Sequence, residues 1–406
     1  MSRRSALRPR REDPAGPTLP RRPLASVWLL AFGAFAVGTG LFALGGVLPA
    51  LATAFHVTQA TAGQSVTVFA VAYIVGAPVA AYLGARWPTR RVLLVGLATF
   101  TLGNAATAAA PNLVVLFLSR VVSALGAATF TPVALGAAVA LVPAPRRGQA
   151  LAIVMSGLNG ALAVGVPLGV VLSRIGSWRS AVVLVAALGL TAIIVIFLGI
   201  RHLPAGAPTS LPRAAAMLRR RSVLVVLGVT VLAVAAGICA YTYIADILDQ
   251  TAGATSNQYL LLLVVYGVGA FCGSLGAGPF TDRFGPGRAL VSSVSLLIVT
   301  LLLVPVATSF TAAALLMLVW GAAFTACITP QQYRLVGLVP DDATVAVSFN
   351  SSATYLGQAV GAATGGIALS AGLARRDLPF LAAGLAVCAL IVHLTATPSS
   401  SRRGIA

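Results

Sequence analysis

Long apolar blocks alternate with short polar connections along almost the whole chain. A block of roughly 20 apolar residues can cross the hydrocarbon core of a bilayer as a helix. In lipid the backbone must satisfy its own hydrogen bonds, so these blocks are expected to be helical. The short alternating segments typical of a transmembrane β-barrel are not found. The pattern predicts an all-α membrane protein with twelve transmembrane helices, at about 24–50, 62–84, 91–110, 113–141, 149–172, 179–200, 222–247, 258–280, 288–306, 311–338, 343–370 and 378–397.

Composition supports this interpretation. Hydrophobic residues make up 58% of the 406 residues and charged residues only 9%, whereas soluble proteins carry roughly 25% charged residues. Too little polar surface is available to cover a soluble body of this size. The blocks divide the chain into a basic, Pro-rich N-terminus that we expect to be disordered, a first bundle, a polar connection, a second bundle and a tail, at 1–23, 24–200, 201–221, 222–397 and 398–406.

Basic residues give the chain a formal net charge of +19, and all 27 of them are arginine. A basic protein can bind nucleic acid. Here, however, the arginines lie singly or in small clusters between apolar blocks. If the N-terminus is cytoplasmic, 22 arginines lie inside, four lie outside and Arg120 lies within a helix. This split follows the positive-inside rule and predicts that both termini are cytoplasmic; we expect no nucleic-acid partner.

The two halves of the chain repeat one another at a constant offset of 197 residues. Parallel repeats of six helices imply a substrate path between the halves, exposed alternately to the two sides of the membrane. The sequence therefore predicts two pseudo-symmetric six-helix bundles that move a small molecule. The offset places six residues of the first half, Arg86, Arg91, Gly76, Gly160, Gly169 and Arg179, on Arg283, Arg288, Gly273, Gly357, Gly366 and Arg376.

The connection after the second predicted helix, and its copy after the eighth, resemble the G-x-L-x-D-R-x-G-R-R loop of the major facilitator superfamily. The second copy keeps four residues of this pattern, Asp282, Arg283, Gly285 and Arg288. The first copy keeps Arg86 and Arg91 but has Ala85 in the position of the acid and Pro88 in that of the glycine.

Two further stretches strengthen the resemblance. Residues 120–128 are similar to the intramembrane arginine motif of the family. The stretch Gly165-Val166-Pro167-Leu168-Gly169 is similar to the motif of its antiporter branches. Together with Leu48-Pro49, Leu102-Gly103-Asn104, Gly176-Ser177-Trp178-Arg179 and Tyr241-Thr242-Tyr243, the chain resembles the drug:proton antiporter family, near its arabinose-efflux and chloramphenicol-exporter members, over about 24–397.

Arg120 is the sharpest chemical feature of the sequence. A charge inside a membrane helix costs at least ~2.5 kcal/mol, so the side chain should face a polar cavity. It could contact substrate, the carboxylate of a coupling proton or backbone carbonyls. Alternatively, it could bond neighbouring helices in a purely structural role.

The loop residues form the next group of candidates. We expect Asp282, Arg283, Gly285 and Arg288, with Arg86 and Arg91, to make a cytoplasmic latch of ion pairs and helix-end contacts. Simple topology is the alternative, because arginines hold loops inside. The small faces of two predicted helices should permit close packing, and the resemblance implies a gating seam between the halves; they carry Gly165, Pro167 and Gly169, and Gly357, Gly361 and Gly365.

Carboxylates are scarce, which bears on proton coupling. No Asp or Glu occurs between Pro14 and Ala245. Where relatives carry Glu in a Gly-Thr-x-Glu-Phe stretch, this chain has Leu41. Asp246 is the acid nearest a helix interior, and it is either a coupling residue or an exposed acid at the outer edge. Other cavity candidates, for which core packing or interhelical hydrogen bonds are the alternatives, are Phe42, Asn104, Asn159, Tyr241, Tyr243, Asn350 and Gln358.

No catalytic, metal-binding or nucleotide-binding motif is found, so we expect neither an enzyme nor a cofactor, and no ATP-driven pump. The sequence favours a monomeric secondary transporter of a bacterial inner membrane that exports a small, partly apolar compound, driven by the proton gradient that the resemblance implies. One alternative is a sugar or metabolite exporter of the same fold. Another is a membrane receptor or interaction protein that kept the fold and lost coupling.

Overall fold

The structure is a computed structural model, and it describes residues 23–84, 86–200, 203, 216–252 and 256–396. For a few residues within helices, only the backbone is described. The two termini and most of the central connection, which were expected to be cytoplasmic, therefore lie outside the described residues, as does nearly all of the N-terminus that was expected to be disordered.

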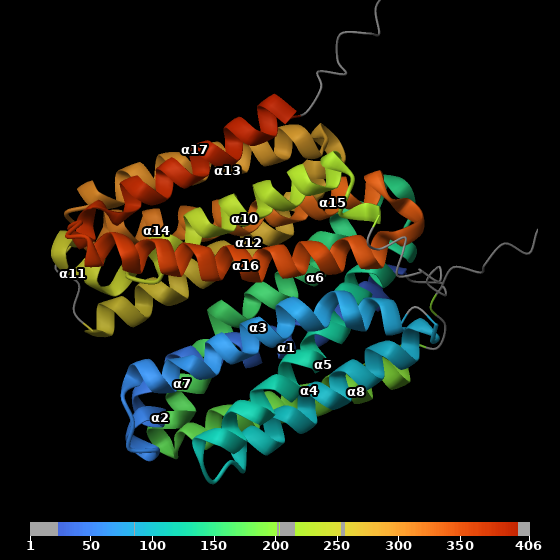
Figure 1. The fold of residues 1–406 in the computed structure, drawn as a ribbon, viewed down its shortest axis with the longest axis horizontal. Coiled ribbons are helices and arrows are strands. Elements are labelled where there is room, and N and C mark those ends of the chain that lie inside the picture. The colour runs from blue at the N-terminus through green and yellow to red at the C-terminus, as the bar shows by residue number, and fades with distance from the viewer. Residues whose placement is uncertain (1–22, 85, 201–202, 204–215, 253–255, 397–406) are drawn as a thin grey trace, which may run out of the picture.

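The first half of the chain forms six membrane-crossing helical segments, several of them built from more than one helix (Figure 1). The successive helices are α1 (Pro23–Gly46), α2 (Leu48–Ala54), α3 (Gln59–Gly84), α4 (Thr89–Ala108), α5 (Leu113–Ala140), η1 (Ala144–Arg146), α6 (Arg147–Gly160), η2 (Ala161–Gly165), α7 (Val166–Ile175) and α8 (Trp178–Gly199).

The second half follows the same plan. It contains α10 (Arg221–Tyr241), α11 (Ile244–Ala252), α12 (Ser256–Phe284), α13 (Pro286–Leu303), η3 (Val304–Val306), α14 (Phe310–Ala326), α15 (Ile328–Leu338), η4 (Pro340–Asp342), α16 (Ala343–Ser370), η5 (Arg375–Asp377) and α17 (Leu378–Ala396). The predicted fold class is confirmed: the described residues form helices and no strand, arranged as two bundles.

The 197-residue repeat is visible down to the helix caps. Adding 197 to the bounds of α4 gives 286–305, and α13 with η3 spans 286–306. Asn112 caps α5, where its Oδ1 accepts a hydrogen bond of 3.0 Å from the backbone N–H of Val115. Its counterpart Ser309 caps α14, where its Oγ accepts one of 3.2 Å from the N–H of Ala312. Such side-chain oxygens satisfy N–H groups that a helix start leaves free.

Eleven helical segments within the described residues are long and apolar enough to cross a membrane. The remaining segment, α16, is 28 residues long but too polar to meet the same measure. The outer surface of the bundles carries apolar stripes. On α3, for example, Val71, Val75 and Val79 recur every fourth residue and are exposed, so this face suits lipid rather than water.

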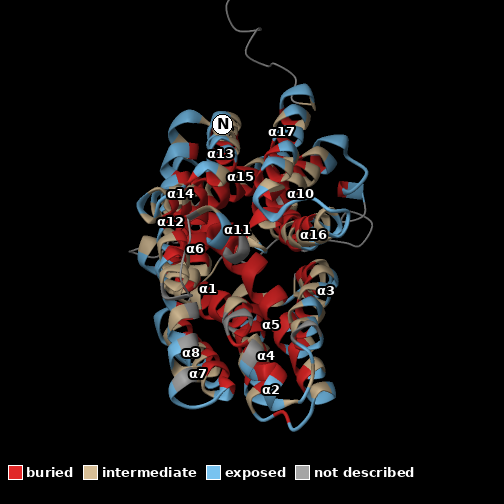
Figure 2. Cartoon of the chain, turned by 90° about the vertical axis from the view of Figure 1, so that its left-hand side faces the viewer, coloured by how far each residue is buried: buried red, intermediate tan, exposed pale blue. Residues whose placement is uncertain are grey.

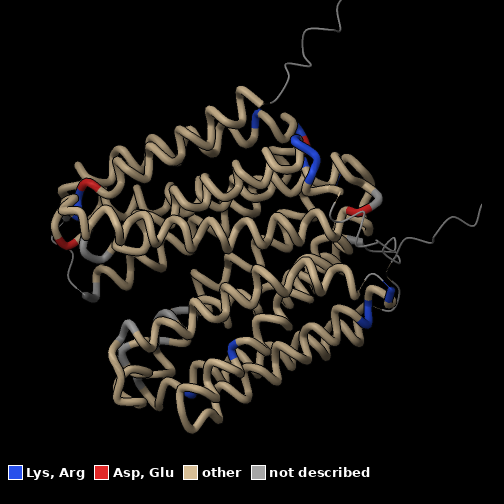
Figure 3. The backbone as a smooth tube through the Cα atoms, in the orientation of Figure 1, with Lys and Arg blue, Asp and Glu red and all other residues tan. Residues whose placement is uncertain are grey.

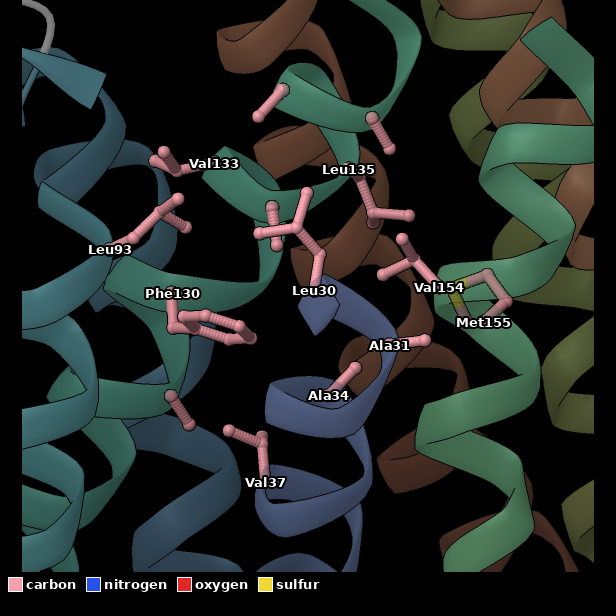
Figure 4. Close-up of a cluster of buried hydrophobic side chains, with 14 of the residues drawn as sticks. Leu30, Ala31, Ala34, Val37, Leu93, Phe130, Val133, Leu135, Val154 and Met155 are labelled. Atoms are coloured by element: carbon pink, nitrogen blue, oxygen red, sulfur yellow. The ribbon is translucent and has the colours of Figure 1, made fainter. Parts of the chain in front are cut away.

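Each bundle has a large hydrophobic core, and Figure 2 shows buried residues gathered in the middle of both. The core of the first bundle also extends into the second half, to Ile328, Val347 and Tyr355. In the first bundle, the Phe130 ring of α5 packs against α1 beside Leu30 and Ala34 (Figure 4). Gly33 makes this contact possible, because a Cβ there would collide with the Phe130 ring.

Charged residues collect at the two ends of the bundles (Figure 3). We call the end with Arg90, Arg147, Arg283 and Arg334 the basic end, and the end with Arg179 and Asp377 the opposite end. The two bundles converge towards the basic end and diverge towards the opposite end, which carries α2 and α11 (Figure 1).

Candidate functional site

A cavity of about 70 Å³ lies between the two bundles. Helices of the first half provide one wall and helices of the second half the other. The lining residues are Leu41, Phe42, Tyr73, Thr131, Leu135, Met155, Leu158, Asn159, Leu162, Ile238, Tyr241, Tyr266, Phe324, Ile328, Gln332, Ser351, Thr354, Tyr355 and Gln358.

The lining combines aromatic rings and aliphatic side chains with a few amides and hydroxyls. Such a surface suits a small, partly apolar molecule that is oriented by a few hydrogen bonds. None of the lining residues is charged. Leu41, at the position where the resemblance to drug:proton antiporters implies an acid, lies in this wall. The lining has a leucine and no carboxylate at this position.

Four residues predicted from the sequence line the cavity, namely Phe42, Asn159, Tyr241 and Gln358. Asn159 also crosses between the halves, since its Nδ2 donates a hydrogen bond of 2.8 Å to the Ser274 Oγ of α12. Sequence reasoning missed the other polar and aromatic lining residues, namely Tyr73, Thr131, Tyr266, Phe324, Gln332, Ser351, Thr354 and Tyr355.

Three predicted candidates lie away from the cavity. Asn104 of α4 is buried, and its Nδ2 donates to the Phe100 carbonyl of its own helix. Asn350 accepts a hydrogen bond of 2.8 Å from Thr230, within the second bundle. The Tyr243 hydroxyl lies 3.4 Å from the Ala362 carbonyl of α16. Each of these contacts joins residues of one bundle, as the structural alternative anticipated.

Asp246 lies in α11 at the opposite end, but its side chain is outside the described residues. The neighbouring Asp249 is exposed. The proposed role of Asp246 in proton coupling therefore stays a prediction.

Arg120 is fully buried in α5. Its Nη2 donates to the Gly40 carbonyl of α1 at 3.4 Å, and its guanidinium carbon lies 4.3 Å from the centre of the Phe69 ring. Nε and Nη1 are buried with no hydrogen-bond partner among the described atoms. Arg120 itself does not line the cavity, but Tyr355, which does, is close enough to interact with it electrostatically.

A pair of tyrosines bridges the two halves beside Arg120. The rings of Tyr73 in α3 and Tyr355 in α16 lie 4.0 Å apart between centroids. Phe69 completes the cluster at 6.4 Å from each ring. Both tyrosines are almost completely buried, and both line the cavity.

Asp282 connects the halves at the basic end. The sequence placed it in a loop, but α12 continues to Phe284, so Asp282 is helical. Its two carboxylate oxygens each accept a hydrogen bond of 2.9 Å, from the backbone N–H groups of Gly148 and Gln149. These groups belong to the first turn of α6, where the helix dipole favours a negative charge. The expected latch consisted of ion pairs and contacts with helix ends. Asp282 makes the second kind of contact, with the start of α6.

The latch arginines are exposed and form no ion pair within the described part of the chain. Arg86 lies near the Tyr82 ring, with its guanidinium carbon 5.9 Å from the centroid, and Arg283 stacks on Phe284 at 5.2 Å. Gly285 begins the next helix with φ at +83°, in the region that favours glycine. Its counterpart Pro88 has φ at −55°, so the two loops turn differently. Ala85 lies outside the described residues, while Arg91 and Arg288 are exposed.

The glycine faces pack within bundles rather than between them. On α16, a Cβ at Gly361 would lie 2.5 Å from the Ala235 carbonyl oxygen of α10. A Cβ at Gly165 would collide with Thr39 of α1. Gly169 is buried, and Pro167 follows the π-helical turn η2. The glycines of α16 and Gly165 thus pack against helices of their own bundle, and a role of these faces in gating stays a prediction.

Backbone does approach backbone between the halves elsewhere. A Cβ at Gly267 of α12 would lie 2.5 Å from the Ala163 nitrogen of η2, and one at Gly278 would lie 2.5 Å from the Gly148 carbonyl oxygen. Small residues permit such approach in lipid. The contact surface between α12 and the α6–η2 segment therefore forms part of the seam.

The family profile described as Major Facilitator Superfamily matches residues 30–248 and 225–405. The chain belongs to the major facilitator superfamily. Members of this family are carriers rather than enzymes, and the cavity shared by two repeated bundles is consistent with this.

Curated relatives cover most of the chain. The inner membrane transport protein YdhP of Escherichia coli (strain K12) is 35% identical over 364 residues, which are 89% of this chain and 93% of that protein. A chloramphenicol resistance protein of Streptomyces lividans is 36% identical over 280 residues, 67% of this chain and 70% of that one. The chain is thus a multi-pass membrane protein with a relative in a bacterial inner membrane.

Solved structures share the fold at low identity. The transporter FucP in its outward conformation matches with a TM-score of 0.76 at 16% identity, over 93% of this chain and 99% of that one. The human organic anion transporter MFSD10 (TETRAN) matches with a TM-score of 0.74 at 17% identity, over 93% of this chain and all of that one.

Proposed function

We propose that this carrier exports a small, partly apolar organic compound across a bacterial inner membrane by alternating access. The cavity between the bundles is the observation that carries the proposal. It offers aromatic rings from both halves, such as Tyr73, Tyr241 and Tyr266, beside the amides of Asn159, Gln332 and Gln358. Rings of this kind accept a flat apolar molecule, and the amides orient its polar groups.

Export of a drug-like compound is further supported by the relative named as a chloramphenicol resistance protein. A sugar is bound mainly by hydrogen bonds, whereas most of this lining is aliphatic or aromatic. The lining therefore favours a partly apolar compound over a sugar.

The driving force in this proposal is the proton gradient, in keeping with the resemblance to drug:proton antiporters. Because the cavity lining holds no carboxylate, the proton would be taken up elsewhere in the chain. Asp246 of α11 is the candidate that the sequence offers.

Proteoliposomes containing the full chain, loaded with a pH-sensitive dye and an imposed pH gradient, test this function. A panel of compounds led by chloramphenicol is added. We expect at least one partly apolar compound to accelerate collapse of the gradient, and cells expressing the chain to tolerate that compound better than cells without it. Binding with an undisturbed gradient would instead identify a receptor. Collapse by sugars alone would identify a sugar exporter.

A matched pair of variants connects transport to the cavity. Gln358→Ala removes a lining amide, whereas Gln64→Ala removes an exposed amide of α3. Loss of one hydrogen bond of about 1 kcal/mol weakens substrate binding by roughly fivefold. We therefore expect Gln358→Ala to raise the KM by about this factor and Gln64→Ala to leave it unchanged. Equal KM values for both variants would place the substrate outside this cavity.

A further inference from the structure

The charge of Arg120 has no anionic partner in its own bundle. The chain contains no Asp or Glu between Pro14 and Ala245, so no acid of α1, α3, α5 or α6 can pair with it. A single carbonyl, that of Gly40 at 3.4 Å, accepts from Nη2, and the face of Phe69 covers the guanidinium. Two of its nitrogens are buried without a hydrogen-bond partner among the described atoms. A buried cation is costly unless a negative charge accompanies it at some stage.

The repeat shows that the fold does not need a charge at this position. The counterpart of Arg120 in the second half, 197 residues further on, is Met317, which lies in the core of α14. The counterpart of Phe69 is Tyr266, and that of Gly40 is Gly237. At the matching positions the second half thus has an aromatic residue and a glycine, with an apolar side chain in the place of the guanidinium. Packing alone therefore does not account for the guanidinium.

The tyrosine pair connects Arg120 to the cavity. Tyr73 belongs to the first half and Tyr355 to the second, and their tilted rings, 4.0 Å apart, both line the cavity. Tyr355 also lies close enough to Arg120 to interact with it electrostatically. Movement of one half against the other would separate these rings. In this structure the guanidinium is fully buried, with the Phe69 ring over it and both tyrosine rings 6.4 Å from the Phe69 ring between centroids.

We propose that Arg120 binds the anionic group of a monoanionic, otherwise apolar organic substrate, and that separation of Tyr73 and Tyr355 uncovers it. This inference rests on the proposed transport function and narrows its substrate class to compounds such as aromatic carboxylates. The guanidinium offers a planar pair of donors for a carboxylate, and the aromatic cluster offers a surface for the ring.

Chemical modification of Arg120 in the purified full chain tests the proposal without a transport assay. Phenylglyoxal reacts with accessible guanidinium groups, and peptide mass spectrometry quantifies the modification of Arg120 alone. We expect slow modification in the parent protein and several-fold faster modification in Tyr355→Ala. Tyr82→Ala, which removes a ring of α3 that lies beside Arg86 and does not line the cavity, is the matched control and should leave the rate unchanged.

The ligand class is tested with benzoate, its neutral isostere benzamide, and chloride as separate probes. We expect benzoate to slow modification of Arg120 in Tyr355→Ala, and benzamide and chloride to leave it unchanged. If chloride, but not benzoate, slowed modification of Arg120, the proposal that the site binds an organic anion would be overturned. Equal protection by benzamide would overturn a role for the negative charge.

Binding by charge variants completes the test. Thermal stabilisation of the parent protein by benzoate should be lost in Arg120→Gln and partly retained in Arg120→Lys, which keeps a cation but not the planar pair of donors. Full retention in Arg120→Gln would overturn the proposal. If the parent protein and Arg120→Gln transport a neutral aromatic compound equally well and neither binds benzoate, the anion site fails while the proposed export function stands.

Discussion

At the scale of single residues, one carboxylate closes the basic end of the carrier. Asp282 accepts two backbone hydrogen bonds at the start of α6, across the boundary between the halves. The equivalent position in the first half is Ala85, which cannot make such a contact. The two copies of the loop therefore differ in chemistry, and closure at this end depends more on the second copy.

Removing this carboxylate should favour separation of the halves at the basic end. Hydrogen bonds to a charged group contribute about 2 kcal/mol, so Asp282→Ala should shift the equilibrium towards separation by roughly thirtyfold. Spin labels at Pro145→Cys and Gly287→Cys, in a background without the four native cysteines, report the distance by pulsed electron resonance. Asp249→Ala, an exposed acid at the opposite end, is the control. An unchanged distance distribution in Asp282→Ala would show that other contacts hold this end closed.

Single residues of the site were only partly predictable from the sequence. Of the candidates from the sequence, Phe42 and Gln358 line the cavity and Asn104 does not, although all three stand in apolar helices. In a membrane protein, lipid and core are both apolar, so an amphipathic pattern does not show which face points inward. Tyr73 and Tyr355 were missed because only the docking of α3 on α16 brings them together.

At the scale of elements, α16 uses two of its faces for different purposes. Its glycines, including Gly357 and Gly361, pack against α10, while Ser351, Thr354 and Tyr355 face the cavity. The Ser352 hydroxyl also donates to the Ile74 carbonyl of α3 at 2.8 Å. One helix therefore joins the core of its own bundle to the other half.

The glycine face of α16 should tolerate no added methyl group. A Cβ at Gly361 would lie 2.5 Å from the Ala235 carbonyl oxygen, whereas one at Gly228 of α10 would meet nothing within 4 Å. Overpacking costs about 1–3 kcal/mol. We therefore expect Gly361→Ala to lower the apparent Tm in detergent. Gly228→Ala should leave it unchanged or raise it, because alanine favours helix by up to about 1 kcal/mol. A Tm for Gly361→Ala at or above that of the parent would contradict this packing.

Helix positions followed closely from the sequence, but interruptions within helices did not. The predicted 343–370 and 113–141 agree with α16 and α5 to within one residue. The breaks between α10 and α11 and between α14 and α15 were not predicted, and neither was the π-helical form of η2. Apolar composition continues through each of these points, so hydropathy gives no signal there. Only η2 has a signal in the sequence. Pro167, which follows it, lacks an N–H and therefore needs a local change in the helical hydrogen bonds.

At the scale of the whole molecule, the constant offset relates helix bounds of the first bundle to those of the second, such as α4 to α13, and so explains why the fold could be predicted from one sequence. The relation of the bundles to the membrane was predicted from charge alone. The described arginines of the basic end, such as Arg146, Arg220 and Arg283, should face the cytoplasm according to the positive-inside rule.

Cysteine labelling in intact cells tests this orientation. Pro145→Cys lies at the basic end and Pro111→Cys at the opposite end, and both positions are exposed. In a background without native cysteines, a membrane-impermeant maleimide should label Pro111→Cys in intact spheroplasts. It should label Pro145→Cys only after the membrane is permeabilised. The reverse labelling pattern would show that the basic end faces the outside of the cell and the opposite end faces the cytoplasm.

The polarity of α16 also has a consequence for biogenesis. A segment that is too hydrophilic to partition into the bilayer unaided must rely on neighbouring helices that accept its hydroxyl and amide groups during insertion. α10 and α3 are made earlier in synthesis and present such surfaces. We therefore expect α16 to enter the membrane only through contacts with helices that are already inserted. Substitutions that disrupt α10 or α3 would then leave α16 outside the membrane, and the misfolded chain would be degraded.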